Sequence, residues 1–311
     1  MKIIRDLSSC PPEYKGATIA LGNFDGVHLG HQAILKRCID IAKKEGSPAA
    51  VMTFEPHPRE FFSKGGEKLR IYSFRDKVEL LRDGDIEALF VARFNPGFAL
   101  LSAEDFVNIL HHRLAARHVV TGYNFAFGNN RQGNTEFLAE AAERLGFDFS
   151  ACLPVDDADG KPISSSAIRG LLAAGDVKKA AGLLGRPYRI TGHVQSGEQR
   201  GRTLGFPTAN LSLKHLFKPR FGIYAARIAI EDGTWHDGVA SLGVKPTFGT
   251  HEPLLEAHLF DRNDDLYGQR VRVELVDFIR EEKYFNSAEA LRSEMTEDCK
   301  KAKEMLHAHR R

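Results

Sequence analysis

The sequence has 311 residues, which is enough for one large domain or two domains of ordinary size. Its 42% hydrophobic and 27% charged residues exclude a disordered chain, and a formal net charge of +2 gives no electrostatic reason to expect nucleic acid or an anionic membrane as a partner. The four cysteines are far apart, and the sequence contains neither a signal-peptide pattern nor a run of about 18 apolar residues that would span a bilayer. We therefore expect a soluble, cytoplasmic protein.

The first 185 residues alternate short apolar runs with longer segments of helical periodicity. Ser102 precedes one of these segments and is a candidate N-cap. Such alternation is typical of βα units, so residues 1–185 are predicted to form an α/β domain with a mostly parallel, Rossmann-like sheet. The predicted strands are 17–21, 49–54, 87–94, 117–122 and 147–155, and the predicted helices between them are 32–44, 74–84, 102–114 and 134–146.

The pattern changes after "GRPY" (185–188). Short β-rich runs follow one another, separated by Gly, Pro and Asp, without helical segments between them. In the last run Val271, Val273 and Leu275 alternate with charged residues, which is the period of a half-buried strand. Residues 186–311 are therefore predicted to form a second domain, an antiparallel β-barrel that ends in a helix from about Ser287.

"GNFDGVHLGH" (22–31) connects the first predicted strand to the first predicted helix. Its glycines allow a tight turn, and the N–H groups at the start of a helix favour an anion. His28 and His31 are three residues apart, so both rings can face a ligand there and donate hydrogen bonds to phosphoryl oxygens. The alternative is that these histidines only cap the helix.

Two stretches resemble the signatures of the adenylyl- and cytidylyltransferase superfamily. "GNFDGVHLGH" is similar to its H-x-G-H signature, and "ISSSAIR" (163–169) is similar to its second signature. Without this resemblance "ISSSAIR" would be an ordinary helix N-cap. The resemblance implies catalytic roles for His28 and His31. It also implies an ATP site made of Gly22, Asn23, Phe24, Asp25, Gly30, Ser164, Ser165, Ser166 and Arg169.

Two further stretches narrow the resemblance to the prokaryotic bifunctional riboflavin kinase/FAD synthetases. They are "TFEPHPREFF" (53–62) and "GYNFAFGNNRQG" (122–133). The resemblance implies that His57, Asn124 and Phe125 bind the flavin, although this family frequently has Asp where the chain has Asn124. From the residues alone, "TFEPHP" is equally a stiff structural turn, and aromatic residues spaced as in the second stretch are more often core.

"RGRTLGFPTANL" (200–211) lies in the predicted barrel. Thr208 and Asn210 alternate along an extended segment, so their oxygens can face one side and hold a hard cation such as Mg²⁺. The stretch resembles the G-R-x-L-G-x-P-T-A-N motif of riboflavin kinases; otherwise it would be a β-turn with a solvated arginine. The resemblance implies that ATP is bound here by Gly201, Arg202, Gly205 and Pro207.

Residues 254–285 resemble the same kinase family. Glu256 is at the position of the family's catalytic glutamate, which implies that it accepts the 5′-hydroxyl proton of riboflavin. In a strand it would otherwise be a solvent-facing Glu. Lys245 stands where the family often has Arg, and we assign it no role because lysine lacks the planar fork of arginine.

The resemblance covers nearly the whole chain and implies two reactions. Residues 186–311 would phosphorylate riboflavin to FMN with ATP and Mg²⁺, and residues 1–185 would join AMP from a second ATP to FMN, giving FAD and pyrophosphate. The expected partners are riboflavin, FMN and ATP, without nucleic acid or membrane; flavoproteins that receive the product are conceivable, but no residue pattern identifies them. Two alternatives stay open: only one half is active, or the protein stores or delivers flavins.

Overall fold

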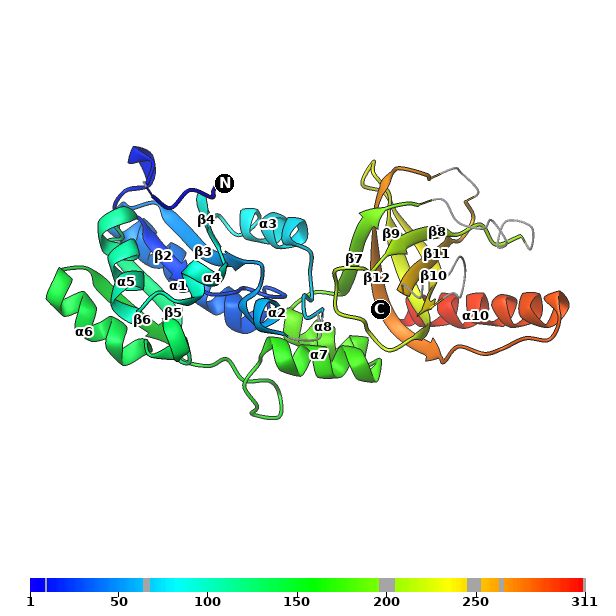
Figure 1. Cartoon of the computed structure of the whole chain (residues 1–311). Coiled ribbons are helices and arrows are strands. Elements are labelled where there is room, and N and C mark those ends of the chain that lie inside the picture. Colours follow the sequence, from blue (N-terminus) through cyan, green and yellow to red (C-terminus); the bar gives the residue numbers. More distant parts are fainter. Residues whose placement is uncertain (9, 64–67, 196–204, 245–252, 263–265, 310–311) are drawn as a thin grey trace. The chain divides into compact units, whose positions relative to one another are not determined.

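The computed structural model describes residues 1–8, 10–63, 68–195, 205–244, 253–262 and 266–309 (Figure 1). The chain forms two compact units. The N-terminal unit consists of Met1–Leu69 and Phe74–Ser164, and the C-terminal unit consists of Arg70–Ser73 and Ser165–Arg311. Among the helices of these described ranges, none is both long enough and apolar enough to cross a bilayer.

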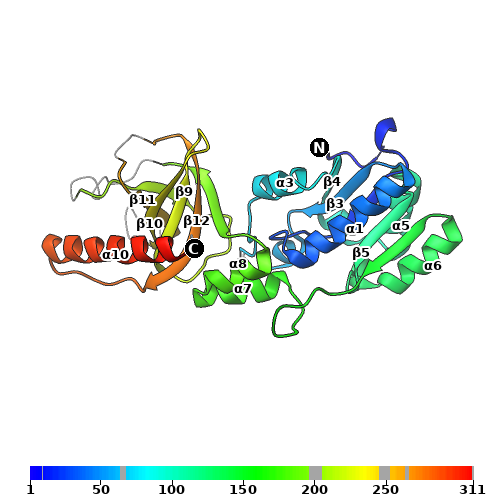
Figure 2. The same cartoon turned by 180° about the vertical axis from the view of Figure 1, so that it is seen from behind.

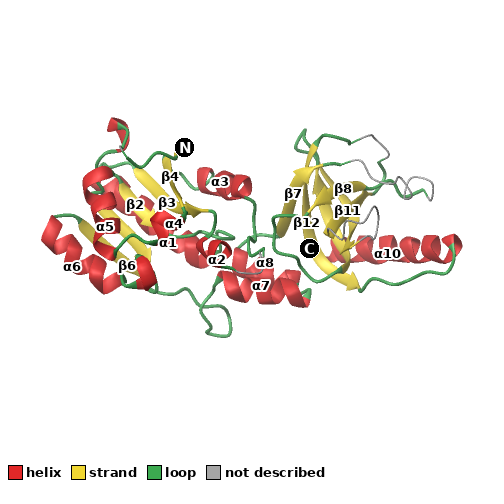
Figure 3. Ribbon diagram, in the orientation of Figure 1, coloured by secondary structure: helices red, strands yellow, loops and turns green. Residues whose placement is uncertain are grey.

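The N-terminal unit contains a six-stranded sheet with the order β1-β4-β3-β2-β5-β6, in which all neighbouring strands are parallel. Figure 3 shows how helices and strands alternate along this part of the chain. The predicted α/β, Rossmann-like domain is thus confirmed. The strands are β1 Lys2–Ile4, β2 Thr18–Leu21, β3 Ala49–Glu55, β4 Ala88–Arg93, β5 His118–Gly122 and β6 Asp148–Cys152. The helices are α1 Leu29–Glu45, α2 Pro58–Phe62, α3 Phe74–Arg82, α4 Pro96–Ala99, α5 Ala103–Asn108 and α6 Thr135–Leu145, with a π-helical turn at Ile109–Arg113 and short 3₁₀ turns at Pro12–Tyr14 and Asn129–Arg131.

Both faces of this sheet are covered. One apolar cluster includes Leu35 of α1 and Leu81 of α3, and Figure 2 shows α1 lying across the sheet. The other cluster includes Phe106 of α5 and Leu138 of α6. Because both faces are buried, β2 and β3 are apolar along almost their whole length, as is usual in parallel sheets.

The C-terminal unit is built on an antiparallel sheet with the order β7-β12-β9-β10-β11-β8. Beside its outer strands, Gln195 N donates to Asn210 O over 2.9 Å, so the sheet curls into a nearly closed barrel. Val271, Val273 and Leu275 are buried, and the predicted barrel is confirmed. The elements of this unit are α7 Ser165–Ala174, α8 Val177–Leu184, β7 Tyr188–His193, β8 Ala209–Ser212, β9 Gly222–Ala229, β10 Trp235–Val244, β11 Pro253–Leu259, β12 Arg270–Arg280 and α10 Ala288–His309.

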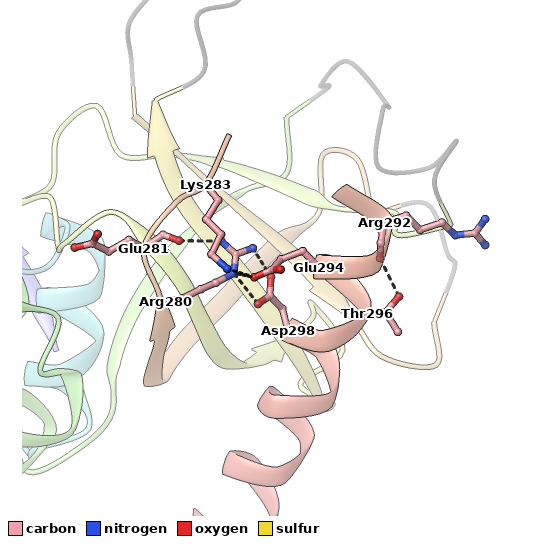
Figure 4. A network of polar contacts seen from close by, with 7 residues as sticks. All are labelled: Arg280, Glu281, Lys283, Arg292, Glu294, Thr296 and Asp298. Carbon is pink, nitrogen blue, oxygen red and sulfur yellow. Dashed lines mark hydrogen bonds and ion pairs between the residues drawn. The ribbon is translucent and has the colours of Figure 1, made fainter. Parts of the chain in front are cut away.

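The terminal helix α10 is attached to the barrel by an ion-pair network (Figure 4). Arg280, at the end of β12, donates from Nε to Asp298 Oδ1 over 2.8 Å and from Nη2 to Asp298 Oδ2 over 2.6 Å. Asp298 is only 3% exposed, and Glu294 Oε1 lies 3.1 Å from Arg280 Nε. Farther along the helix, Ala302 and Leu306 pack in an apolar cluster with residues of the barrel. Both ion pairs and apolar contacts therefore fix α10.

Three segments outside the barrel strands complete the C-terminal unit. Ile71 and Tyr72 are buried, and the Tyr72 ring stacks on that of Tyr188, with centroids 5.9 Å apart. Helices α7 and α8 also belong to this unit, and Lys178 Nζ of α8 lies 2.6 Å from Asp277 Oδ2 of β12. The sequence-based division into domains of residues 1–185 and 186–311 stays a prediction; the compact units of the structure separate after Ser164 instead.

Candidate active sites

The loop between β2 and α1 has an unusual backbone. Phe24, Gly26 and Val27 have φ angles of +49°, +83° and +43°, which lie in the left-handed region. Such angles are costly for Phe and Val, and the loop is held in place because both side chains are almost fully buried. Strained loops of this kind concentrate at ligand-binding sites. The binding site that the sequence predicts at this loop stays a prediction.

His28 and His31 lie together at the start of α1. His28 is the N-cap residue, and its Nδ1 accepts a hydrogen bond from His31 N over 3.3 Å. The two rings are stacked, with centroids 3.6 Å apart and planes 20° apart. A neutral imidazole that accepts at Nδ1 carries its proton on Nε2, so Nε2 is the donor atom of His28. His28 thus caps the helix through Nδ1, and its proposed role as a hydrogen-bond donor through Nε2 stays a prediction.

Gly30 lies between the His28 ring and the backbone of Ile163, within the N-terminal unit. A Cβ atom at this position would lie 3.2 Å from ring atoms of His28 and 3.5 Å from the backbone oxygen of Ile163. A side chain at this position would have to push the His28 ring away by a few tenths of an ångström. The backbone of Ile163, the first residue of "ISSSAIR", therefore lies close to the His28 ring, although the two residues are far apart in the sequence.

The predicted ATP-binding residues are divided between the two units. Those of the β2–α1 loop and Ser164 belong to the N-terminal unit. Ser165, Ser166 and Arg169 lie in the first turns of α7, in the C-terminal unit. There, Arg169 is 8% exposed and donates from Nη2 to Ser166 Oγ over 3.4 Å. The serines and the arginine therefore form a polar group at a helix start.

The predicted flavin-binding residues lie at the ends of β3 and β5, near the carboxyl edge of the sheet. His57 is the N-cap residue of α2, and its Nδ1 accepts from Arg59 N over 3.1 Å. Asn124 is exposed and Phe125 is half-buried. Phe127 is 6% exposed and contacts the core, so the core interpretation is correct for this ring.

A group of aromatic side chains beside His57 did not emerge from the sequence motifs. Phe62 of α2 is 63% exposed, and its ring lies 5.2 Å from that of Phe61 and 5.7 Å from that of Phe94. An exposed ring supported by two others offers a flat apolar surface near the carboxyl edge of the sheet. The adjacent Phe61 and Phe62 of the short helix after His57 are the signal in the sequence for this surface.

In the barrel, Asn210 and Glu256 are directly opposite each other. Asn210 of β8 is the register partner of Glu256 of β11, and Ser241 of β10 is the next partner in the same row. Side chains at opposite positions of antiparallel strands lie on one face, with Cβ atoms about 4.5–5.5 Å apart. Asn210 is 7% exposed, and Glu256 is half-buried. The amide of the predicted metal site and the predicted base are therefore neighbours.

His258 supports the segment that leads to Asn210. Its Nδ1 lies 2.8 Å from the backbone oxygen of Pro207 and donates to it. Burial lowers the pKa of His258, which favours the neutral ring at neutral pH. The hydrogen bond to Pro207 places the proton of this ring on Nδ1. Gly205 precedes this segment with a φ of +88°, and Thr208 lies between Pro207 and β8. Gly201, Arg202 and Lys245 are outside the described residues.

Comparison with known proteins covers the whole chain. Residues 10–167 match the FAD synthetase family, and residues 184–306 match the riboflavin kinase family. The chain is 39% identical to a protein of Haemophilus influenzae over 99% of its own length and 100% of that protein, and 40% identical to one of Pseudomonas fluorescens over 100% of both. Both are named bifunctional riboflavin kinase/FMN adenylyltransferase.

Among solved structures, the fold matches a crystal structure described as a macrolide-efflux protein from Streptococcus pneumoniae. The TM-score is 0.83 at 31% identity, over 95% of this chain and 96% of that one. The likeness extends over both units, as do the matches to the two enzyme families. The chain belongs to the family of bifunctional riboflavin kinase/FMN adenylyltransferases.

Proposed function

We propose that this chain phosphorylates riboflavin to FMN and then adenylylates FMN to FAD, with one ATP consumed in each reaction. The observation that carries the proposal is that two groups of side chains, one in each unit, are of the kinds that phosphate chemistry uses. One is the pair of stacked histidines at the start of α1, and the other is the row that joins Asn210 to Glu256. Neither reaction needs a covalent enzyme intermediate, because positioning and charge neutralisation supply most of the catalysis in such transfers.

In the kinase reaction, Glu256 accepts the proton of the 5′-hydroxyl of riboflavin. The freed oxygen attacks the γ-phosphorus of ATP, and ADP leaves with the electrons of the broken P–O bond. Thr208 and Asn210 offer a hydroxyl and an amide oxygen, the hard donors that fit Mg²⁺. When bound, Mg²⁺ would neutralise charge on the ATP phosphates. Gly201, Arg202, Gly205 and Pro207 are proposed to line the nucleotide.

In the adenylyltransferase reaction, a phosphate oxygen of FMN attacks the α-phosphorus of ATP, and pyrophosphate leaves. His28 and His31 donate hydrogen bonds to the phosphoryl oxygens as negative charge develops on them. The backbone N–H groups at the start of α1 stabilise the same charge. Gly22, Asn23, Phe24, Asp25 and Gly30 are proposed to enclose the nucleotide, and Ser164, Ser165, Ser166 and Arg169 to hold the leaving pyrophosphate. His57, Asn124 and Phe125 are proposed to bind the flavin.

One incubation tests the proposal. The protein is mixed with riboflavin, ATP and Mg²⁺, and riboflavin, FMN and FAD are separated by chromatography over time. We expect FMN to appear first and FAD to follow. FMN alone would show that only the kinase half is active, and a yellow protein that forms neither product would favour flavin storage or delivery.

The proposed Mg²⁺ ligands predict a specific rescue. Replacing Thr208 or Asn210 by alanine removes one oxygen ligand, so FMN formation should fall at low Mg²⁺ and recover in part as Mg²⁺ is raised. Thr234→Ala is the matched control, because this hydroxyl bonds to Asp232 in an exposed turn. Initial rates are measured over a range of Mg²⁺ concentrations. A loss of activity that is the same at every Mg²⁺ concentration would contradict the assignment.

The proposed division of activities predicts the behaviour of fragments. A fragment of residues 187–311 should form FMN but no FAD, because it lacks both superfamily signatures. It should also be less stable than residues 165–311, because it loses α7 and α8, which pack in the same unit. Both fragments lack Ile71 and Tyr72, whose burial contributes about 1.5–3 kcal/mol for each large apolar side chain.

Thermal unfolding and FMN formation are measured for both fragments and for the full chain. We expect the melting temperature to fall in the order full chain, 165–311, 187–311. A fragment 187–311 that also makes FAD would disprove the division.

A further inference from the structure

A buried lysine lies at the carboxyl edge of the N-terminal sheet, and the reactions described above do not use it. The side chain of Lys77, on α3, is 6% exposed. Its ammonium group lies 3.1 Å from Glu55 Oε1 at the end of β3 and 3.4 Å from Thr53 Oγ1 in the same strand. Buried lysines need partners of this kind, because an unpaired ammonium group is strongly destabilised away from water.

The hydrogen bonds around Thr53 have a defined direction. A lysine ammonium group only donates, so Thr53 Oγ1 accepts from Lys77. The single proton of the Thr53 hydroxyl is then donated to the backbone oxygen of Asn23, over 3.1 Å. Thr53 is fully buried, so water does not compete for these bonds. Lys77 therefore orients a hydroxyl toward the β2–α1 loop.

The two contacts of the ammonium group lead to both sides of the proposed adenylyltransferase site. Asn23 begins the loop in which Phe24, Gly26 and Val27 have left-handed backbone angles, and a bond to its carbonyl helps to hold that strained turn. Glu55 is two residues before His57, and its backbone oxygen accepts from Phe94 N over 2.8 Å. Lys77 thus connects the loop proposed for ATP to the segment proposed for the flavin.

Packing alone does not account for this arrangement. A buried ion pair is often no more stabilising than apolar side chains of similar size, because both charges lose their hydration. The Lys77 ammonium group also fixes the orientation of the Thr53 hydroxyl and the position of the Glu55 carboxylate. In nucleotidyl transfer, misplacement of a phosphate or of the attacking group by about 1 Å is costly.

We propose that Lys77 is a positioning residue of the FMN adenylyltransferase reaction, acting on the β2–α1 loop through Thr53 and on the "TFEPHP" segment through Glu55. This inference rests on the function proposed for that loop. Lys77 does not touch substrate. Its effect is to keep the backbone on both sides of the site in the geometry that transfer requires.

Thr53 provides the sharpest test, because changing it removes the connection to Asn23 and leaves Glu55 as the partner of the Lys77 ammonium group. Thr53→Val keeps the shape of the side chain and removes the hydroxyl, whereas Thr53→Ser keeps the hydroxyl. FAD formation from supplied FMN is measured while ATP and FMN are varied separately. We expect kcat/KM for ATP to fall about tenfold in Thr53→Val, because one hydrogen bond is lost and the β2–α1 loop is held less firmly. In Thr53→Ser it should stay near the value of the unmodified protein. The KM for FMN should not change in Thr53→Val.

Lys77→Met should lower kcat/KM for both ATP and FMN, because it removes the contacts to Thr53 and to Glu55. Lys36→Met is the matched control: Lys36 lies in the same unit, but its pair with Asp40 is exposed. FMN formation from riboflavin in the same preparations reports on the intactness of the other site and should be unchanged in all four variants. Equal ATP dependence of Thr53→Val and Thr53→Ser would overturn the proposal.

Amide hydrogen exchange gives a readout that does not depend on activity. If the Thr53 hydroxyl holds the loop, amides in residues 23–27 exchange faster in Thr53→Val than in Thr53→Ser. Identical exchange in the two variants would disprove the positioning role even if the unmodified protein formed no FAD. Absence of FAD from the unmodified protein would instead contradict the proposed function of the loop.

Discussion

Replacing His28 should nearly abolish FAD formation while FMN accumulates. The His28 ring is almost fully buried at the start of α1, and its proposed role is to donate a hydrogen bond to a phosphoryl oxygen in the transition state. Removing one such donor from a preorganised site costs on the order of 2.7–4 kcal/mol, or roughly 10²–10³-fold in rate. The kinase reaction uses a different site, so riboflavin should still be converted to FMN at the usual rate.

Two substitutions separate this role from helix capping. His28→Ala also removes the acceptor for His31 N, whereas His28→Asn keeps a good N-cap side chain and removes only the imidazole. His31→Ala tests the second ring, and His112→Ala, at an exposed position of the same unit, is the control. FAD formation from FMN is followed by chromatography. If His28→Asn and His31→Ala both made FAD at the normal rate, the histidines would have no part in the transfer.

Glu256→Gln should reduce FMN formation from riboflavin by about 10²–10⁴-fold, the usual contribution of a general base. The substitution keeps the size of the side chain and does not change the backbone pairing of β11 with β8 and β10. An amide cannot accept the hydroxyl proton, so the attacking oxygen is not activated. Glu231→Gln, in an exposed turn, is the matched control.

The comparison between substrates locates the defect. In Glu256→Gln, supplied FMN should become FAD at a nearly normal rate, because the β2–α1 loop is unchanged. Supplied riboflavin should yield little of either product, because FMN is the intermediate between the two reactions. Equal amounts of FAD from riboflavin and from FMN would show that Glu256 is not the base.

The features that local patterns determine were well predicted. Ser102 caps its helix by accepting from Asp105 N over 3.0 Å, as expected from its place before the periodic segment. The two kinds of sheet also follow from sequence, since continuous apolar runs separated by helices lead to a parallel sheet and alternating runs without helices lead to an antiparallel barrel. β1 was not predicted, because three residues are too few to show a period.

Features that depend on register or on distant partners were not predictable from one sequence. Nothing in "PTAN" or "LLEAH" indicates that Asn210 faces Glu256, because strand pairing is decided by the whole sheet. Lys77 lies in a helix rich in charged residues, where a lysine is normally solvated, and only the tertiary structure places it beside Glu55. His258 is a similar case, since its partner is a backbone oxygen of Pro207.

The position of residues 70–73 in the C-terminal unit has a consequence for folding during synthesis. These residues belong to the C-terminal unit, yet they precede almost all of it in the sequence. During synthesis Ile71 and Tyr72 leave the ribosome long before Tyr188 and the barrel strands that follow it. Both side chains therefore stay exposed to water until those strands have been made. The core of the C-terminal unit is complete only when residues 70–73 have packed into it. A nascent chain stopped before β7 should therefore be more easily cleaved by protease at 70–73 than the finished protein.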